Sequence, residues 1–291
     1  MITNTLAIIF PIFFITFLGF VTAKVKKIDQ KTLANYMVFI ASPALVFTQL
    51  SMQKINLAEL ASISLAATTT ILGCVLAAYL FFKITRINAP AGLYLPIMSM
   101  NSGFIGFPLT LLALGVAGLS QAIIYNMVNA IFIFTLGIFI VSQGRDRWQF
   151  LKVPFIYAAI LGITLSLVGI KIPQYMFSPL YLLGGSAIPI ALFMLGGRLT
   201  TIKISAWKLP LLAASLRLGL GLGLGLLSVF LFKLQGTAAS VVILLSSLSS
   251  GVTAVALAEE YDSNPDLVAS TVALSMILSI FVIAGVLQWL I

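Results

Sequence analysis

Two short polar segments that contain glycine interrupt long apolar runs of this chain. The first is Asn101-Ser-Gly-Phe-Ile-Gly-Phe-Pro108, and the second is Ser249-Ser-Gly-Val-Thr-Ala254. Lipid cannot satisfy free backbone N–H and C=O groups, so a helix interrupted at membrane depth must be buried in protein or line a cavity. Two such interruptions in corresponding parts of one chain are typical of the substrate site of a secondary transporter. These residues therefore predict a carrier.

The first segment has the residue types that break a helix. Pro108 cannot donate a backbone hydrogen bond, and its ring frees the carbonyl of Phe104. Gly103 and Gly106 permit an unwound backbone. We expect two half-helices that meet near the centre of the bilayer, where their N-terminal N–H groups and partial positive charge can hold an anion without a buried cation.

Amides and hydroxyls near both breaks are the predicted contacts of the substrate. Asn101 can donate to a carboxylate oxygen or accept from a hydroxyl. Asn126 and Asn129 share one face of the next span because they are three residues apart. The alternative is that these groups only bond neighbouring helices, as polar residues inside membranes often do. The predicted substrate-binding residues are Asn101, Ser102, Gly103, Gly106, Pro108, Asn126, Asn129, Ser249, Ser250, Gly251, Thr253 and Pro43.

Arg217 is the only charged residue that we expect well inside a span, so it needs a partner there. It could attract or neutralise an anionic substrate, or it could bind lipid phosphate or the carbonyl end of a broken helix. The sequence places no Asp or Glu near the centre of a span, which disfavours proton coupling through a buried carboxylate. Uniport of an anion and sodium coupling both stay open, the latter through the hydroxyls of Ser246, Ser247, Ser249, Ser250 and Thr253.

The composition is that of a polytopic membrane protein. Hydrophobic residues make up 61% of the chain and charged residues only 8%, and the mean hydropathy is +1.16, far from the balance of soluble domains. The formal charge of +9 does not indicate nucleic acid binding, because Lys and Arg are spread between apolar runs. The absence of His and the single Cys74 exclude an intramolecular disulfide and disfavour most zinc sites. We expect no cofactor and no metal.

Ten apolar runs are each long enough, at roughly 20 residues, to cross a bilayer core of about 30 Å. They cover residues 5–23, 33–51, 58–82, 90–116, 121–142, 153–170, 179–197, 209–232, 237–258 and 266–290. The loops between them are short and leave no room for a soluble domain.

Basic residues alternate between the loops and set the predicted orientation. One set of alternate loops carries Lys24, Lys26, Lys27, Lys31, Lys83, Arg86, Arg145, Arg147, Lys152, Arg198, Lys203 and Lys208, whereas the other set carries only Lys54, Lys171 and Lys233. The positive-inside rule places the larger set in the cytoplasm. We therefore expect a multi-pass protein of the cytoplasmic (inner) membrane with both termini outside.

Five spans per half require the second half to enter the membrane from the opposite side. The two predicted repeats are residues 1–145 and 146–291. Their second spans correspond, since Tyr36 to Phe47 contains Pro43 and Tyr181 to Phe193 contains Pro189. Both spans are expected to be kinked at these prolines.

These residues resemble the auxin efflux carrier family, which includes plant auxin exporters and bacterial carriers for malonate or related acids. The string from Asn101 to Pro108 is similar to the fourth-span crossover of that family. Ala258-Glu-Glu-Tyr261, followed by Pro265-Asp266, is similar to its junction between the ninth and tenth spans. One departure is that Ser249 and Ala254 stand where members usually have a proline in the ninth span.

The resemblance implies an all-α membrane protein of ten helices in two inverted five-helix repeats, with crossed and broken fourth and ninth helices. It implies a scaffold of spans 1, 2, 6 and 7, a transport domain of spans 3–5 and 8–10, elevator-like alternating access and a homodimer.

The function predicted from all these features is secondary transport of a small organic anion, a monocarboxylate or dicarboxylate. The predicted partners are that anion, the lipid bilayer, a second copy of the chain and, if transport is coupled, sodium. The alternative from another class is a membrane-embedded sensor or receptor without turnover, which would favour unbroken helices and a cytoplasmic output surface. A membrane enzyme is disfavoured, because neither an acid pair nor an activated nucleophile is evident inside the spans.

Overall fold

The computed structural model describes residues 2–26, 28–53, 56–142, 154–200 and 207–290, and every regular element in these ranges is helical. The first half contains α1 (Ile2–Val25), α2 (Gln30–Tyr36), η1 (Met37–Ala41), α3 (Ser42–Met52), α4 (Leu57–Thr85), η2 (Ala91–Leu93), α5 (Tyr94–Met98), η3 (Ser102–Gly106), α6 (Phe107–Phe132), η4 (Ile133–Gly137) and α7 (Ile138–Val141). The second half contains α8 (Pro154–Val168), α9 (Gln174–Gly185), α10 (Ala187–Leu199), α11 (Lys208–Leu231), α12 (Gly236–Ser246), α13 (Thr253–Glu260) and α14 (Pro265–Leu290). The predicted all-α class is confirmed.

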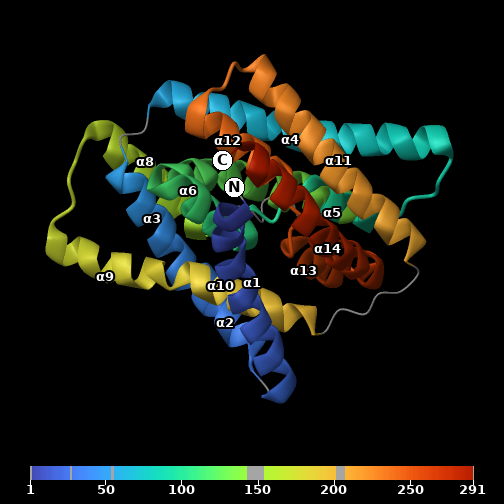
Figure 1. Cartoon of the computed structure of the whole chain (residues 1–291), viewed down its shortest axis with the longest axis horizontal. Helices are drawn as coiled ribbons and strands as arrows, with labels where there is room; N and C mark the ends of the chain where they lie inside the picture. The colour runs from blue at the N-terminus through green and yellow to red at the C-terminus, as the bar shows by residue number, and fades with distance from the viewer. Residues whose placement is uncertain (1, 27, 54–55, 143–153, 201–206, 291) are drawn as a thin grey trace.

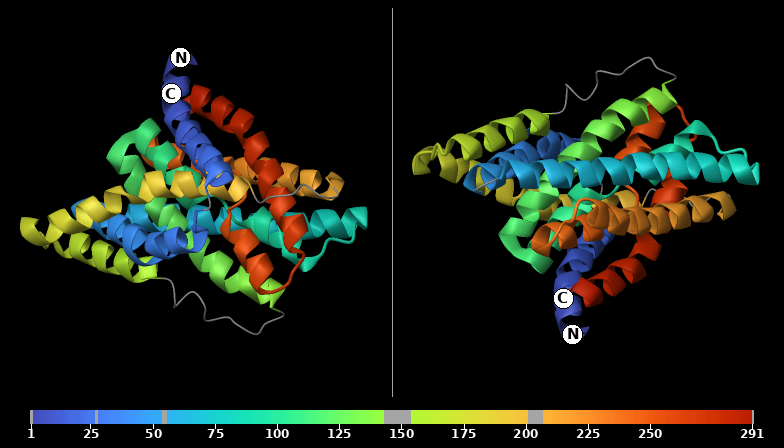
Figure 2. Two further views of the ribbon diagram at one scale, coloured as in Figure 1. Left: turned by 90° about the horizontal axis from the view of Figure 1, so that it is seen from below. Right: turned by 90° about the horizontal axis from the view of Figure 1, so that it is seen from above.

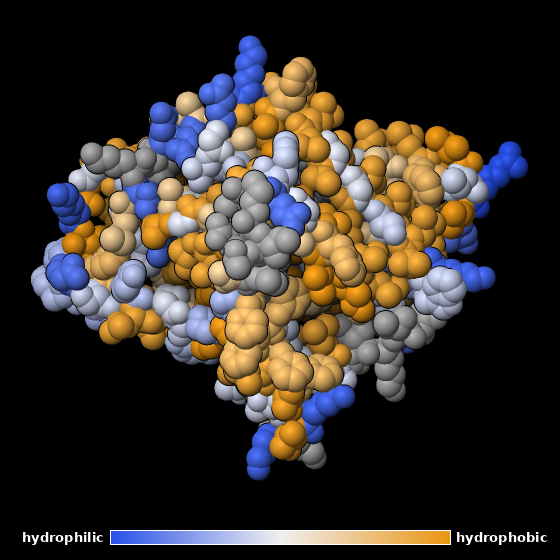
Figure 3. All heavy atoms as spheres, viewed as in Figure 1, coloured by the Kyte–Doolittle hydropathy of each residue, from blue (hydrophilic) through white to orange (hydrophobic). Residues whose placement is uncertain are grey.

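The surface of the molecule is suited to lipid. Within the described ranges, six helical segments are long and apolar enough to cross a membrane, and three shorter helices are also apolar. Large apolar side chains are exposed on these helices, among them Phe230 (79%), Phe281 (75%) and Leu182 (75%). In Figure 3 hydrophobic side chains cover most of the visible face, and hydrophilic ones gather at its margins. Together these features describe a multi-pass membrane protein.

The helices pack in two groups (Figure 1). In the first group α1 packs against α10, and α3 packs against α8 and α9; in the second, α11 packs against α4, α12 and α14, and α6 packs against α4 and α12. Contacts between the groups run mainly through α6, η3 and α14. The two ends of the chain lie side by side in all three views (Figures 1 and 2).

Both predicted proline kinks coincide with a distortion of the helix. The π-helical turn η1 ends two residues before Pro43, and the helix is interrupted at Ser186, three residues before Pro189. The two distortions touch, because the hydroxyls of Tyr36 and Ser186 are 2.9 Å apart and hydrogen-bonded. This contact links the two proline-containing spans across the first group.

The turn between the predicted fourth and fifth spans is shorter than expected. Instead of a loop after residue 116, the backbone leaves helical geometry only at Gly115, with φ 70° and ψ −165°. Glycine adopts this conformation without the steric penalty that other residues carry. The turn separates the helix that follows the first break from the remainder of α6.

Several sequence predictions fall outside the described residues. These are the basic residues Lys27, Lys54, Arg145, Arg147, Lys152 and Lys203, and the boundary between the two predicted repeats at 145 and 146.

Candidate functional site at the crossing of two broken helices

The structure interrupts the helix at both polar segments. The first break lies between Met98, where α5 ends, and Ser102, where η3 begins; Ser99 is extended, with φ −96° and ψ 133°. The second lies between Ser246 and Thr253, the end of α12 and the start of α13. The second break is the longer one although it lacks a proline.

The unwound residues of the first break differ from the expected ones. Gly103 and Gly106 lie within the π-helical turn η3, whereas the backbone is unwound earlier, at residues 99–101. A Cβ atom at Gly106 would lie 2.6 Å from Cδ2 of Leu245. Gly106 therefore serves close packing against α12 rather than unwinding.

The two breaks pair with each other as a short antiparallel bridge, with Met100 opposite Ser250. The backbone N–H of Asn101 donates to the carbonyl of Ser249 at 2.9 Å. In return, the N–H of Gly251 donates to the carbonyl of Ser99 at 3.0 Å. Backbone groups that lipid cannot satisfy are thus satisfied by the other broken helix.

Side chains from two flanking helices complete the pairing. Asn129 of α6 accepts from the N–H of Met100 through Oδ1 (3.2 Å) and donates to its carbonyl through Nδ2 (2.9 Å). Ser275 of α14 accepts from the N–H of Ser250 at 3.0 Å. Each break is therefore held by the backbone of the other break and by one polar side chain from a neighbouring helix. We call these paired backbone segments, with Asn129 and Ser275, the frame of the crossing.

A second set of bonds connects this frame to the start of η3. The Ser102 hydroxyl donates to Oδ1 of Asn126 at 2.7 Å and accepts from Nδ2 of Asn129 at 3.0 Å. Because Asn126 and Asn129 lie one helical turn apart on α6, they contact the same side of the break.

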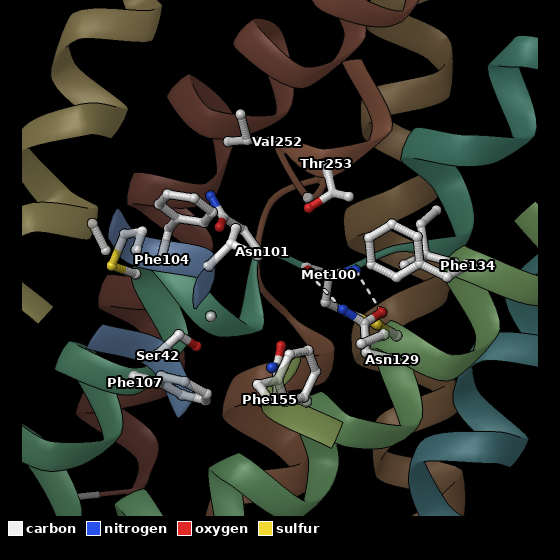
Figure 4. A pocket seen from close by; sticks show the side chains of 18 of the residues that line it. Ser42, Met100, Asn101, Phe104, Phe107, Asn129, Phe134, Phe155, Val252 and Thr253 are labelled. Carbon is white, nitrogen blue, oxygen red and sulfur yellow. Dashed lines mark hydrogen bonds between the residues drawn. The ribbon is translucent and has the colours of Figure 1, made fainter. Parts of the chain in front are cut away.

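A cavity of about 340 Å³ lies against the first break, between the two groups of helices. Its polar lining is small: Ser42, Asn101, Asn126, Asn129, Thr253 and Glu260. Four phenylalanines, Phe104, Phe107, Phe134 and Phe155, make up much of its apolar wall (Figure 4). The remaining lining residues come from η1, α3 and α10 on one side, from α6, η4, α7 and α13 on the other, and from η3 and the two breaks themselves.

Asn101 is the least satisfied polar side chain of this cavity. It is only 2% exposed, and neither its Nδ2 nor its Oδ1 has a hydrogen-bond partner. Figure 4 shows its amide between Phe104 on one side and Val252 and Thr253 on the other. A buried polar group without a partner costs about 1–3 kcal/mol. A ligand with hydrogen-bond donors or acceptors could therefore pair with this amide and remove that cost.

The electrostatics of the cavity come from helix ends rather than from basic side chains. Among the described residues that line it, Glu260 is the only charged one. The N-terminal ends of η3 and α13 both begin at the lining, near Asn101 and Thr253. Unpaired N–H groups and the positive ends of helix dipoles favour an anion at such a position.

The predicted site residues divide into two sets. Asn101, Gly103, Asn126, Asn129, Gly251 and Thr253 line the cavity. Ser102, Gly106, Pro108, Ser249, Ser250, Pro43 and Arg217 are not among the lining residues. In place of Pro43, its neighbour Ser42 lines the cavity. Of the residues outside the lining, Ser249 and Ser250 belong to the paired breaks, and Ser102 bonds the frame through Asn129.

Arg217 is fully buried in α11. Its Nη2 donates to the carbonyl of Ser246 at 2.8 Å, and its Nη1 lies 3.5 Å from Sγ of Cys74. Ser246 is the last residue of α12, so this geometry corresponds to the alternative in which arginine binds the carbonyl end of a broken helix.

The four phenylalanines of the cavity are not among the residues predicted from the sequence. Phe104 and Phe107 lie within the first polar segment, three residues apart, and this spacing could have shown that they share a face. Phe134 and Phe155 carry no such signal, because they reach the cavity only through the packing of η4 and α8.

The family comparison agrees with this arrangement of two paired breaks. The model of a family described as membrane transport protein matches the chain twice, over residues 5–151 and 145–287. The chain belongs to the auxin efflux carrier family of membrane transport proteins. The resemblance carried by the polar segments is thereby confirmed.

Two relatives belong to archaea and are named as uncharacterised transporters. The one from Methanothermobacter thermautotrophicus is 28% identical over 266 residues, which cover 87% of this chain and 86% of the relative. The one from Methanocaldococcus jannaschii is 26% identical over 278 residues, with 89% of both chains covered. The similarity therefore extends over nearly the whole length of this family member.

Proposed function

We propose that this chain is a secondary transporter that carries a small organic anion across the cytoplasmic membrane by elevator-like alternating access. The observation that carries the proposal is the buried, unpartnered amide of Asn101 in a cavity at the crossing of two broken helices. Helix N-termini and amides can hold a carboxylate there without a basic side chain.

Two inverted repeats of five spans account for the order of the elements. The spans are α1, α2–α3, α4, η2 to Gly115, the chain from there through α7, α8, α9–α10, α11, α12–α13 and α14. The separate family matches to each half support a repeat. An even number of spans agrees with chain ends that lie side by side.

The packing supports a division into scaffold and transport domains. The scaffold would consist of α1, α2–α3, α8 and α9–α10, and the transport domain of the remaining spans. Residues of both domains line the cavity. Displacement of the transport domain along the scaffold would therefore change the side of the membrane to which the cavity opens. In the predicted orientation Phe155 and Glu260 lie near cytoplasmic helix ends, so the described state faces inward. A homodimer through the scaffold stays a prediction from the family.

The lining favours an anion with an apolar body. A carboxylate would bind Asn101 and the facing helix ends, and the four phenylalanines would contact the remainder of the molecule. Glu260 would oppose a second negative charge nearby. Of the two substrate classes predicted from the sequence, monocarboxylates fit this lining better than dicarboxylates.

Counterflow in proteoliposomes tests the proposal. Vesicles loaded with an unlabelled short or aromatic carboxylic acid should accumulate the same labelled acid, and Asn101→Ala should reduce this uptake at least tenfold. Asn88→Ala, which alters an exposed asparagine outside the cavity, is the matched control and should behave as the unaltered protein. Unchanged counterflow in Asn101→Ala would refute the role of this residue, and absence of counterflow across the acid panel would refute the substrate class.

A further inference from the structure

The carbonyl end of α12 lies at the crossing. A helix C-terminus carries a partial negative charge and carbonyls without intrahelical partners. Here it ends at Ser246, at the second break, where every residue from Ser246 to Ser250 except Leu248 carries a hydroxyl and all are buried. Oxygen atoms of this kind are what a sodium site would require.

A cationic side chain already lies at this position. The guanidinium of Arg217 donates to the Ser246 carbonyl at 2.8 Å. Its side chain is completely buried, and no carboxylate of the described residues lies within ion-pair distance of it. Within the part of the chain that the structure describes, the positive charge is therefore balanced by the helix end and not by an acid.

The other oxygen atoms of the second break are largely occupied. The Ser246 hydroxyl bonds the Tyr125 hydroxyl at 2.9 Å, and the Ser247 hydroxyl donates to the Leu244 carbonyl at 2.8 Å. The Ser249 carbonyl accepts from the N–H of Asn101. Among the buried hydroxyls of residues 246–250, those of Ser249 and Ser250 have no partner, whereas hard cations are held by about six oxygen ligands.

We infer that Arg217 is a fixed internal cation of the crossing, which neutralises the end of α12 in place of a bound ion, so that transport does not use sodium. The inference deepens the proposed function, on which its statement about transport rests. Arg217 acts as a positioning residue through Ser246, and its charge also repels a second cation from the break. Close approach of α11 is required for this contact, and a Cβ atom at Gly221 would lie 2.2 Å from the Ser246 carbonyl oxygen.

The first test needs no substrate. Thermal unfolding of the purified full-length protein should give the same Tm in sodium chloride and in choline chloride of equal ionic strength. A saturable stabilisation by sodium over choline would overturn the inference, because it would require a bound sodium ion. Failure of carboxylate counterflow would leave this result unaffected, so the two proposals fail separately.

The second test replaces the charge. Arg217→Ala should lower Tm by several degrees, and millimolar guanidinium chloride should restore part of this loss in the variant while leaving the unaltered protein unchanged. A merely structural side chain would not produce rescue by a free cation. Lys208→Met, which removes an exposed charge from the start of the same helix, is the control and should show neither effect.

Two further variants keep the test decisive if Arg217→Ala does not fold. Arg217→Lys should retain most of the Tm, because it keeps a cation at the helix end, whereas Arg217→Met should lose several degrees. Equal Tm values for the lysine and methionine variants would overturn the inference. So would a folded Arg217→Ala that guanidinium does not stabilise.

Discussion

Asn101 and Asn129 are chemically identical, and both lie next to Met100, but their surroundings give them different roles. Asn129 uses both ends of its amide to bond the backbone of Met100. Asn101 bonds through its backbone only, and its side-chain nitrogen and oxygen are buried without partners. Asn129 therefore holds the crossing together, and Asn101 is the residue that we propose for ligand binding.

This difference predicts opposite effects on stability. Asn129→Ala leaves the buried N–H of Met100 unpaired and its carbonyl with only the longer bond from the Ser102 hydroxyl, at 3.4 Å. The loss should cost about 1–3 kcal/mol and lower the Tm in detergent. Asn101→Ala removes two unsatisfied groups, so its Tm without ligand should be unchanged or higher, while stabilisation by a carboxylate ligand should be lost. Thermal unfolding with and without ligand measures both effects. An equal loss of Tm in the two variants would contradict this division of roles.

Residue types alone predict part of the candidate site. Asn101, Asn126 and Asn129 are amides inside apolar runs, and such residues are costly unless they bond something. Ser102 carries the same signal, but its hydroxyl bonds Asn126 and Asn129, since sequence alone does not tell which partner a polar group finds. Phe155 and Glu260 enter the lining only through helix packing, which their local sequence does not encode.

At the scale of elements, glycines allow helix backbones to touch. A Cβ atom at Gly196 of α10 would lie 1.8 Å from the carbonyl oxygen of Thr16 in α1, and one at Gly19 would lie 2.0 Å from the carbonyl oxygen of Phe193. Small residues give membrane helices this close contact, which substitutes for a hydrophobic driving force. The pair α1 and α10 is thus a rigid part of the first group.

A matched pair of glycine substitutions tests this packing. Gly196→Ala must push two backbones apart, and overpacking of this kind costs about 1–3 kcal/mol. Gly285→Ala in α14 meets no atom within 4 Å, so helix propensity should raise stability by up to about 1 kcal/mol. The expected result is a lower Tm for the first variant and an equal or higher Tm for the second. If Gly196→Ala is as stable as the unaltered protein, α1 and α10 do not depend on this contact.

The existence of both breaks could be predicted, but their boundaries could not. Pro108 and the glycines around it marked the first break, yet unwinding occurs at residues 99–101, before Gly103. The reason is that Met100 pairs with Ser250, about 150 residues away, and this partner selects which residues are extended. Local residues therefore predict that a helix is interrupted, whereas the distant pairing partner determines which residues are unwound.

At the scale of the whole molecule, the predicted orientation rests on the loops and not on the core. The buried charge of Arg217 is taken up by a helix end, whereas most other basic residues stand in loops or at helix ends, where the positive-inside rule applies. The ten spans that we propose would place both ends of the chain on one side, in agreement with termini that lie side by side (Figure 2). The rule predicts that this side is outside.

Single cysteines measure the orientation directly. The one native cysteine, Cys74, is buried and can be replaced by serine, which keeps a polar group near Arg217. Against that background, cysteine at exposed Asn88 should resist a membrane-impermeant maleimide in intact cells, because its loop follows Lys83 and Arg86 on the predicted cytoplasmic side. Cysteine at exposed Gln235 should be labelled, since it lies between α11 and α12 on the opposite side.

Permeabilised cells provide the control for this experiment, because both cysteines should then react to the same extent. Labelling of the Asn88 variant alone in intact cells would reverse the orientation and, with it, the inward-facing assignment of the cavity. Labelling of both in intact cells would contradict the odd number of membrane crossings expected between them. The fold of the crossing would stand in the first case, since its contacts do not depend on which side is the cytoplasm, whereas the second would require a different set of spans.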